Sequence, residues 1–166
     1  MSSEVSKTDT KSSPLKIYIA GPDVFAPDAI SLGRLMCDAI RNKGYVPLYP
    51  LDNEIDAHET QNLSEQIFIG NIKMIQDCDI VLANLNPFRG SEPDSGTSWE
   101  IGYAFALGKK VIGYIDDTRP MIDKVHDTRG WRVEDLGLPL NLMLCHGTFK
   151  IVQGDFQSAL EQIQVS

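Results

Sequence analysis

The sequence predicts an α/β fold built around a doubly wound, parallel sheet of five strands. Short apolar runs rich in β-branched residues recur along the chain, and segments with helical spacing of apolar residues separate them. This alternation favours parallel strands, because parallel neighbours need a crossover connection that is usually a helix. With right-handed crossovers, we expect the strand order 2-1-3-4-5 of flavodoxin-like folds.

The expected strands are residues 16–20, 45–49, 78–85, 111–115 and 148–152. Gly21 and Pro22 end the first strand. Pro47 has no N–H to donate to a neighbouring strand, which predicts that the second strand lies at an edge of the sheet. Residues 80–83 are all apolar, as expected for a strand buried on both faces.

The expected helices are about residues 27–43, 65–77, 97–108 and 155–164. Apolar residues repeat at helical spacing in the first of them. Gly44 and Gly108 follow the first and third helices, where glycine commonly ends a helix. Ser64 is the expected N-cap of the second helix, and Thr97 or Ser98 that of the third.

The segments outside these elements are polar. Residues 1–14 are rich in Ser, Thr and Lys without an apolar core, so we expect a disordered tail rather than a secretory signal, followed by one domain over residues 15–166. Residues 50–63 form a long acidic loop, and loops of this length often cover or line a site. Residues 116–137 are irregular and mixed in charge.

Composition narrows the range of partners and cofactors. A net charge of −8 opposes binding to a nucleic-acid polymer or an anionic membrane surface, and no apolar run approaches the ~20 residues of a membrane span. The three cysteines and three histidines lie far apart, without the spacing of metal ligands. Residues 20–25, Ala-Gly-Pro-Asp-Val-Phe, stand where a dinucleotide-binding chain would have Gly-x-Gly-x-x-Gly. We therefore expect a cytoplasmic protein without a metal or another cofactor.

Residues 94–104, Asp-Ser-Gly-Thr-Ser-Trp-Glu-Ile-Gly-Tyr-Ala, are the strongest functional candidate. They follow the third strand and open a helix, so Glu100 is expected in its first turn, at the edge where open α/β sheets bind ligands. The helix dipole favours an ionised carboxylate there, which is the form that a nucleophile needs. Asp94 supplies a second acid, and carboxylate pairs work in many glycoside-cleaving enzymes. The alternative is an ordinary capped helix with a solvated Glu100.

Four stretches together resemble the nucleoside 2-deoxyribosyltransferase family. They are residues 94–104, Ile-Tyr-Ile-Ala-Gly-Pro-Asp-Val-Phe at 17–25, Leu-Asp-Asn at 51–53 and Leu-Asn-Leu-Met at 140–143. The resemblance covers about residues 16–160 and implies the same fold. It implies transfer of the 2-deoxyribosyl group between nucleobases, from free 2'-deoxynucleosides, through a covalent intermediate on Glu100, in nucleoside salvage.

The same resemblance implies roles for other residues. Tyr18 orients the nucleophilic carboxylate, and Asp94 binds the 5'-hydroxyl of the sugar. Asn141 and Met143 complete a neighbouring subunit's pocket, which implies a homodimer or higher homo-oligomer with shared active sites. The further expected substrate contacts are Gly21, Phe25, Asp52, Asn53, Glu54, Asn71, Ser95 and Gly96.

Some positions depart from the family pattern or leave the role open. Asn71 stands where several members have Asp, and an amide cannot pass a proton to the leaving base. Asp52, Glu54 or water would then supply that proton. Glu54 stands where glutamine is frequent, so the base preference is open. Phe25 either stacks on the base or closes the core.

Two other functions fit parts of the sequence. The first is a 2'-deoxynucleoside 5'-monophosphate N-hydrolase of the same superfamily, whose members typically have serine at the position of Asp94. An anionic Asp94 would repel the phosphate, although Ser91 and Ser95 lie nearby. A non-catalytic nucleotide-binding module would need neither Glu100 nor Asp94.

Overall fold

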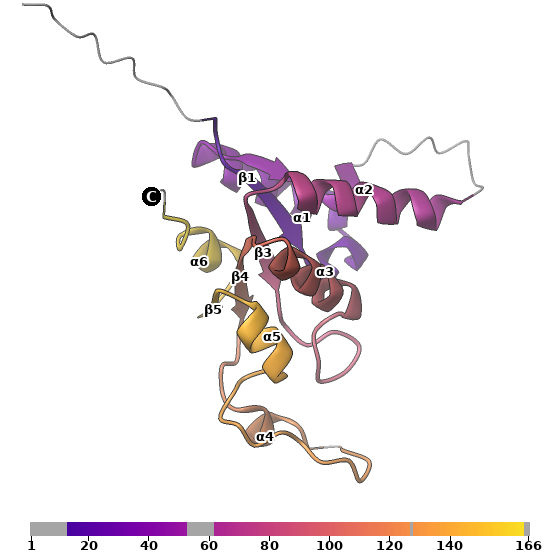
Figure 1. Cartoon of the computed structure of the whole chain (residues 1–166), viewed down its shortest axis with the longest axis vertical. Coiled ribbons are helices and arrows are strands. Elements are labelled where there is room, and N and C mark those ends of the chain that lie inside the picture. The colour runs from indigo at the N-terminus through magenta and orange to yellow at the C-terminus, as the bar shows by residue number, and fades with distance from the viewer. Residues whose placement is uncertain (1–12, 53–61, 127, 165–166) are drawn as a thin grey trace, which may run out of the picture.

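A five-stranded parallel sheet forms the centre of the molecule (Figure 1). The computed structural model describes residues 13–52, 62–126 and 128–164. The strands are β1 (Lys16–Ala20), β2 (Val46–Leu48), β3 (Ile80–Asn84), β4 (Lys110–Ile115) and β5 (Lys150–Gln153). Their order is β2-β1-β3-β4-β5 with parallel pairing throughout, so the predicted fold class and strand order are confirmed. β2, which contains Pro47, lies at an edge as expected.

Helices cover both faces of this sheet (Figure 1). The longer helices are α1 (Ala29–Asn42), α2 (Leu63–Asp77) and α3 (Ser95–Ala106). The short helices are α4 (Met121–Lys124), α5 (Leu142–Gly147) and α6 (Phe156–Leu160), with the 3-10 turns η1 (Pro22–Phe25) and η2 (Pro50–Asp52). Side chains of α1 and α6 form one buried cluster with the sheet, and those of α2, α3 and α5 form the other.

Alternation along β1 distributes its side chains between these two clusters. Ile17 and Ile19 pack toward α1 and α6, whereas Tyr18 and Ala20 pack toward α2 and α3. This follows from the two-residue period of a strand. Tyr18 is fully buried, and its position on β1 directs the phenol toward α3.

The start of α3 differs from the expectation. The helix begins at Ser95, with Asp94 as the N-cap: its Oδ2 accepts hydrogen bonds from the Thr97 backbone N at 2.9 Å and from the Thr97 hydroxyl at 3.1 Å. An N-cap carboxylate readily accepts a hydrogen bond from the backbone N–H three residues later. Asp94 therefore caps the helix, and Thr97 is the donor rather than the N-cap. Glu100 therefore lies in the second turn. Gly108, at φ 71°, ends the helix region as predicted.

Other boundaries also moved. α2 begins at Leu63 after Asn62, whose φ is 66°, and Ser64 is not its N-cap. The short apolar segment after Leu140 is the helix α5, and residues 116–137 include one helical turn, α4. No helix in residues 13–52, 62–126 and 128–164 is long and apolar enough to cross a membrane. The predicted tail falls almost wholly on residues 1–12, outside the described residues.

Gly33 in α1 allows close packing of a buried aromatic ring. A β-carbon at this position would overlap Cε1 of Tyr49 and lie 2.8 Å from its Cζ. Because the Tyr49 ring is buried, we predict that Gly33→Ala lowers the free energy of unfolding by about 1–3 kcal/mol, measured by urea denaturation. Arg34→Ala, at the exposed neighbouring position, is the control and should change it by less than about 0.5 kcal/mol. Equal stability of Gly33→Ala and the wild type would contradict this packing.

Candidate active site

A cavity of about 340 Å³ opens near the carboxyl ends of β1 and β3, between η1, η2, α2 and α3. Its lining residues are Gly21, Val24, Phe25, Pro50, Leu51, Ile67, Asn71, Asp94, Gly96, Thr97 and Glu100. The structure thus brings together six of the residues expected from sequence, which are Gly21, Phe25, Asn71, Asp94, Gly96 and Glu100. This is the edge at which open parallel sheets bind ligands.

Glu100 is the acidic side chain best placed for chemistry in this cavity. The Tyr18 hydroxyl donates a hydrogen bond to Glu100 Oε1 at 2.7 Å. Burial raises the pKa of Glu100 to about 7; the Tyr18 hydrogen bond opposes this rise, and the charge of Asp94 adds to it. The carboxylate is therefore held in one orientation and ionises close to neutral pH.

Tyr18 remains a donor over the whole accessible pH range. Burial, followed by the negative charge of Glu100, raises the pKa of its phenol far above the ordinary value. A phenol that keeps its proton directs one carboxylate oxygen toward itself. The other oxygen, Oε2, is then the atom that can attack a ligand in the cavity.

Asp94 is both the N-cap of α3 and a residue of the cavity wall. Two hydrogen bonds from Thr97 hold its carboxylate, so its position is set by the helix. Gly96 lies beside it, and a β-carbon there would be 3.0 Å from Asp94 Oδ2. A small residue at position 96 therefore leaves the carboxylate accessible from the cavity.

A polar network that the sequence analysis missed supports the adjoining loop. Asn84 Nδ2 donates to both carboxylate oxygens of Asp23, at 3.2 and 3.0 Å, and Asn84 Oδ1 accepts from the Asn86 backbone N at 3.1 Å. A β-carbon on Gly21 would overlap Asp23 and lie 2.9 Å from Asn84 Cβ. Asp23 and Asn84 both lie at the carboxyl ends of buried strands. This position could have identified them from the sequence as residues near the site.

Phe25 does not close the core. Its side chain is 58% exposed, belongs to neither buried cluster, and lines the cavity from η1. Its ring stacks on Phe88, with centroids 5.5 Å apart and an interplanar angle of 17°. Of the two roles considered for Phe25, the structure excludes the one in the core.

Four other expected substrate contacts, Asp52, Asn53, Glu54 and Ser95, are not among the described residues that line this cavity. Asp52 and Ser95 are exposed and are not among the lining residues, although Pro50, Leu51 and Gly96 beside them are. Asn53 and Glu54 lie outside the described residues.

Asn71 connects this cavity to a second one of about 280 Å³. Asn71, Gly96 and Glu100 line both cavities. Phe68 and Trp99 form aromatic walls of the second, with ring centroids 5.6 Å apart. The Glu100 region therefore continues into an aromatic recess between α2 and α3.

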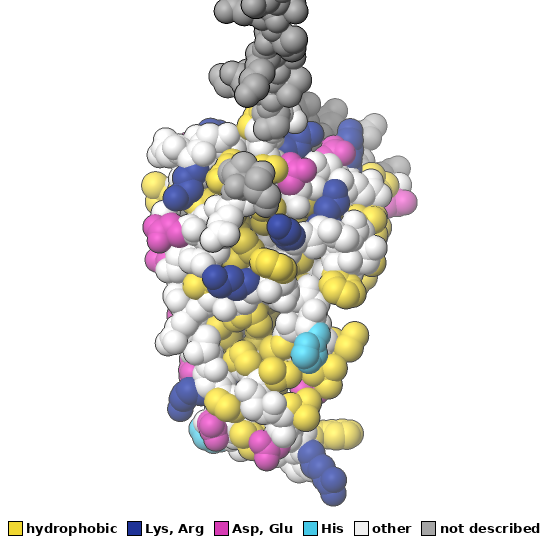
Figure 2. Space-filling view, turned by 60° about the vertical axis from the view of Figure 1, so that its left-hand side comes forward, with side chains coloured by type: hydrophobic (Ala, Val, Ile, Leu, Met, Phe, Trp, Pro, Cys, Tyr) yellow, Lys and Arg dark blue, Asp and Glu magenta, His cyan; other side chains and the backbone are white. Residues whose placement is uncertain are grey.

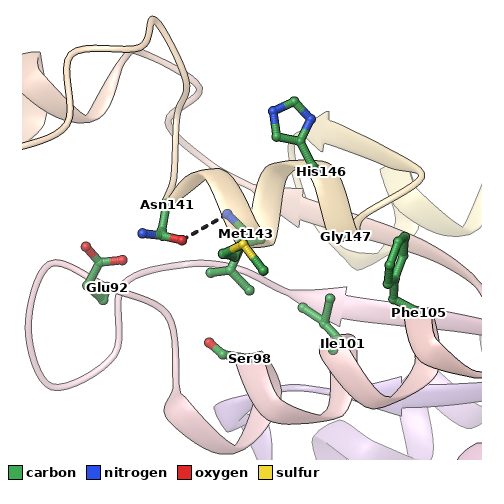
Figure 3. Close-up of a pocket in the computed structure, with 10 residues that line it drawn as sticks. Glu92, Ser98, Ile101, Phe105, Asn141, Met143, His146 and Gly147 are labelled. Carbon is green, nitrogen blue, oxygen red and sulfur yellow. Dashed lines mark hydrogen bonds between the residues drawn. The ribbon is translucent and has the colours of Figure 1, made fainter.

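Asn141 and Met143 lie apart from Glu100 within one chain. They line a different cavity, of about 580 Å³, between α3 and α5 (Figure 3). Asn141 Oδ1 accepts from the Met143 backbone N at 2.9 Å, and Asn141 Nδ2 donates to Glu134 Oε1 at 2.8 Å. Met143 is 74% exposed. One subunit thus does not bring these two side chains to the Glu100 cavity.

No group of three or more His, Cys, Asp or Glu side chains suited to a metal ion occurs in the described ranges, which omit residues 1–12, 53–61, 127 and 165–166.

Comparison with known proteins agrees with the fold. The solved structure of the 2-desoxiribosyltransferase from Leishmania mexicana is 41% identical, with a TM-score of 0.76 over 90% of this chain and 99% of that one. An uncharacterized protein of Schizosaccharomyces pombe is 32% identical over 117 residues, 68% of this chain and 56% of that protein. A Thermofilum pendens protein with the provisional name 2'-deoxynucleoside 5'-phosphate N-hydrolase 1 is 27% identical over 100 residues.

The match with this chain covers only part of each sequence relative: 56% of the Schizosaccharomyces pombe protein and 66% of the Thermofilum pendens protein. The family comparison covers more of the chain: residues 17–143 match the model described as nucleoside 2-deoxyribosyltransferase. Because that match includes well over half of the chain, the protein belongs to the nucleoside 2-deoxyribosyltransferase family.

Proposed function

We propose that this protein transfers the 2-deoxyribosyl group of free 2'-deoxynucleosides from one nucleobase to another, through a covalent intermediate on Glu100. The observation that supports this most directly is the hydrogen bond from Tyr18 to Glu100, 2.7 Å long, at the wall of a cavity that also contains Asp94. A carboxylate that a hydrogen bond holds in position beside a cavity is what a retaining glycosyl transfer requires.

In the first half of the reaction, Glu100 Oε2 attacks the anomeric carbon from the face opposite the base. The carbon–nitrogen bond breaks, its electron pair leaves with the base, and an ester joins the sugar to Glu100. In the second half, a ring nitrogen of another base attacks the same carbon and releases the carboxylate, and its proton passes to the group that protonated the leaving base. Two inversions give net retention. Tyr18 keeps the carboxylate oriented in both halves.

The proton for the leaving base comes from a group other than Asn71. Asn71 lines the cavity and can hydrogen-bond a base edge, but its amide cannot shuttle a proton. We propose that water or Asp52, which follows the lining residue Leu51, supplies it. General acid help of this kind is typically worth about 10²–10⁴-fold in rate.

The proposed substrate is a nucleoside rather than its 5'-monophosphate. Asp94, the residue expected at the sugar 5'-hydroxyl, is an acid, and the described lining residues include neither Lys nor Arg. An anion beside a phosphate dianion is unfavourable without a cation between them. The provisional name of the Thermofilum pendens relative keeps the N-hydrolase as the second candidate.

We further propose a homo-oligomer in which Asn141 and Met143 complete the site of a neighbouring subunit. Trp99, Phe105 and Met143 are all at least 49% exposed, so α3 and α5 present apolar side chains to solvent as well as to the core. Helices that are apolar on several sides are usually covered. Hydrophobic side chains also gather on the face seen in the middle and lower part of Figure 2. Base exchange of this kind would serve nucleoside salvage in the cytoplasm.

The decisive experiment is an exchange assay with a matched set of donors. Deoxyadenosine, deoxyadenosine monophosphate and adenosine are each incubated with a free acceptor base, and kcat/KM is compared. We expect an exchanged nucleoside from deoxyadenosine and little reaction of the other two. Folded Glu100→Gln and Glu100→Ala proteins should lose roughly 10⁴-fold or more of this activity, as other enzymes do without their nucleophile.

Two results would contradict the proposal. Near wild-type exchange by a folded Glu100→Ala protein would remove the covalent mechanism. Release of free base from the monophosphate, without a new nucleoside, would favour the N-hydrolase, and Asp94→Ser should then improve use of the monophosphate.

The raised pKa of Glu100 also makes stability depend on pH. This carboxyl ionises near 4.5 in the unfolded chain and near 7 in the folded protein, so its contribution is fully present below about pH 4.5 and is lost as the pH rises through about 7. Glu100→Gln should therefore be more stable than the wild type at about pH 8, by up to roughly 2–3 kcal/mol, with a difference that shrinks toward pH 4.5. Urea denaturation at several pH values measures it.

Tyr18→Phe provides the matching test of the hydrogen bond. Because the Tyr18 hydroxyl lowers the pKa of Glu100, its removal should move the pH-dependent change in stability to higher pH. A stability difference between Glu100→Gln and the wild type that is the same at every pH would show that Glu100 ionises normally.

Shared sites predict complementation between two inactive variants. In a mixture of Glu100→Ala and Asn141→Ala subunits, a mixed dimer contains one site with both lesions and one with neither. Random exchange of subunits should then restore about a quarter of the wild-type sites. Exchange activity after mixing measures this, and Glu100→Ala mixed with Glu100→Gln is the control without recovery. An active monomer in sedimentation at the assay concentration would contradict shared sites.

A further inference from the structure

Phe25 is an exposed aromatic side chain that is nevertheless held in place. It projects from η1 and lines the Glu100 cavity, with 58% of its surface exposed. Neither buried cluster includes it, so the core does not fix its ring. Its contacts come instead from the connection between β3 and α3, more than sixty residues later in the chain.

Two residues of that connection support the ring. Phe88 stacks on Phe25 with nearly parallel planes. The guanidinium carbon of Arg89 lies 5.2 Å from the Phe25 ring centroid and 4.6 Å from that of Phe88. A cation at these distances is attracted to the electron-rich ring faces. The three side chains thus form one aromatic–guanidinium stack, of which Phe25 is the member that lines the cavity.

The backbone supports the same arrangement. Arg89 has φ 54°, a conformation that is uncommon for a residue with a β-carbon. The turn that contains it is closed by a hydrogen bond from the Phe88 backbone N to the Glu92 carbonyl oxygen at 2.9 Å. The chain therefore adopts a costly conformation at the residue that brings the guanidinium over both rings.

From this geometry we propose that Phe88 and Arg89 are positioning residues that hold Phe25 as a preformed stacking surface for the nucleobase of the substrate. This inference deepens the proposed function and rests on it for the identity of the ligand. A flat, exposed ring beside the Glu100 cavity suits a planar heteroaromatic ligand. Both purine and pyrimidine bases have a flat face that can stack on such a ring. Phe88 and Arg89 act only through Phe25 and do not touch the reacting atoms.

A preformed surface strengthens binding because the side chain is ordered before the ligand arrives. Without Phe88 or Arg89, Phe25 would have to be immobilised during binding. The cost of ordering one side chain corresponds to a loss of about two- to tenfold in affinity. The effect should appear for ligands that contain a base and be absent for deoxyribose alone.

The test is a double-mutant cycle measured by binding. Titration calorimetry on Glu100→Gln protein, which cannot turn over, gives the Kd of deoxyadenosine and of thymidine. Phe88→Ala and Arg89→Ala should each raise the Kd by about two- to tenfold. In a Phe25→Ala protein the same two changes should have no further effect, and Arg89→Lys, which keeps the cation, should retain most of the affinity.

Matched controls come from elsewhere in the fold. Phe149 is an exposed aromatic with the Lys110 ammonium 5.5 Å from its ring centroid, and Arg34 is an exposed arginine on α1. Phe149→Ala and Arg34→Ala should leave the Kd unchanged. With intact Glu100, Phe88→Ala and Arg89→Ala should raise KM in the exchange assay and leave kcat within about twofold.

The outcomes separate this inference from the proposed function. If Phe88→Ala and Arg89→Ala raise the Kd as much in the Phe25→Ala protein as in the protein with Phe25, the positioning role is overturned. An unchanged Kd in the single variants, or no binding of either nucleoside, would overturn it as well. A wild-type protein that binds nucleosides through this stack but exchanges no bases would contradict the proposed transfer and leave the stack established.

Discussion

The hydrogen bond between Tyr18 and Glu100 is the interaction on which the site depends. It joins the inner strand β1 to the helix α3, across 82 positions of sequence. A hydroxyl that is fully buried and cannot lose its proton keeps the nearby carboxylate in one orientation. Burial raises the pKa of Glu100, and the hydrogen bond limits that rise, so the two effects together keep ionisation close to neutral pH.

Specific side-chain contacts also hold other parts of the cavity. Asp94 is fixed as a helix cap by Thr97, and Phe25 is fixed by the stack with Phe88 and Arg89. In each case a residue that faces the cavity is held in place by contacts with other side chains. Such support is what allows a site on loops to keep its geometry without burial in the core.

Helix α3 contributes to two different regions of the surface. Glu100 faces the cavity near β1, whereas Ile101 and Gly102 line the larger cavity under α5. The small residues of α3 lie on different sides of the helix. Ala104 is buried, but Gly102 and Ala106 are exposed, because Thr97, Ile101 and Ala104 share the inward side at helical spacing. The exposed side, with Trp99 and Phe105, is the surface on which a neighbouring subunit is proposed to dock.

The sequence by itself determined the architecture. Apolar runs alternating with helical segments predicted the parallel sheet and its order, and Pro47 predicted the edge strand, because these patterns reflect local chain geometry and burial on two faces. The position of Glu100 and Asp94 after a buried strand also predicted that they lie close together, and both line one cavity.

Only the tertiary structure decided how these residues are held. The N-cap of α3 is Asp94 rather than Thr97, so the helix begins earlier and Glu100 lies in its second turn. Phe25 remained outside the core because its partners Phe88 and Arg89 come from a distant loop. Periodicity and capping act over a few residues, whereas these contacts form between segments that meet only when the strands have assembled side by side, so no local pattern encodes them.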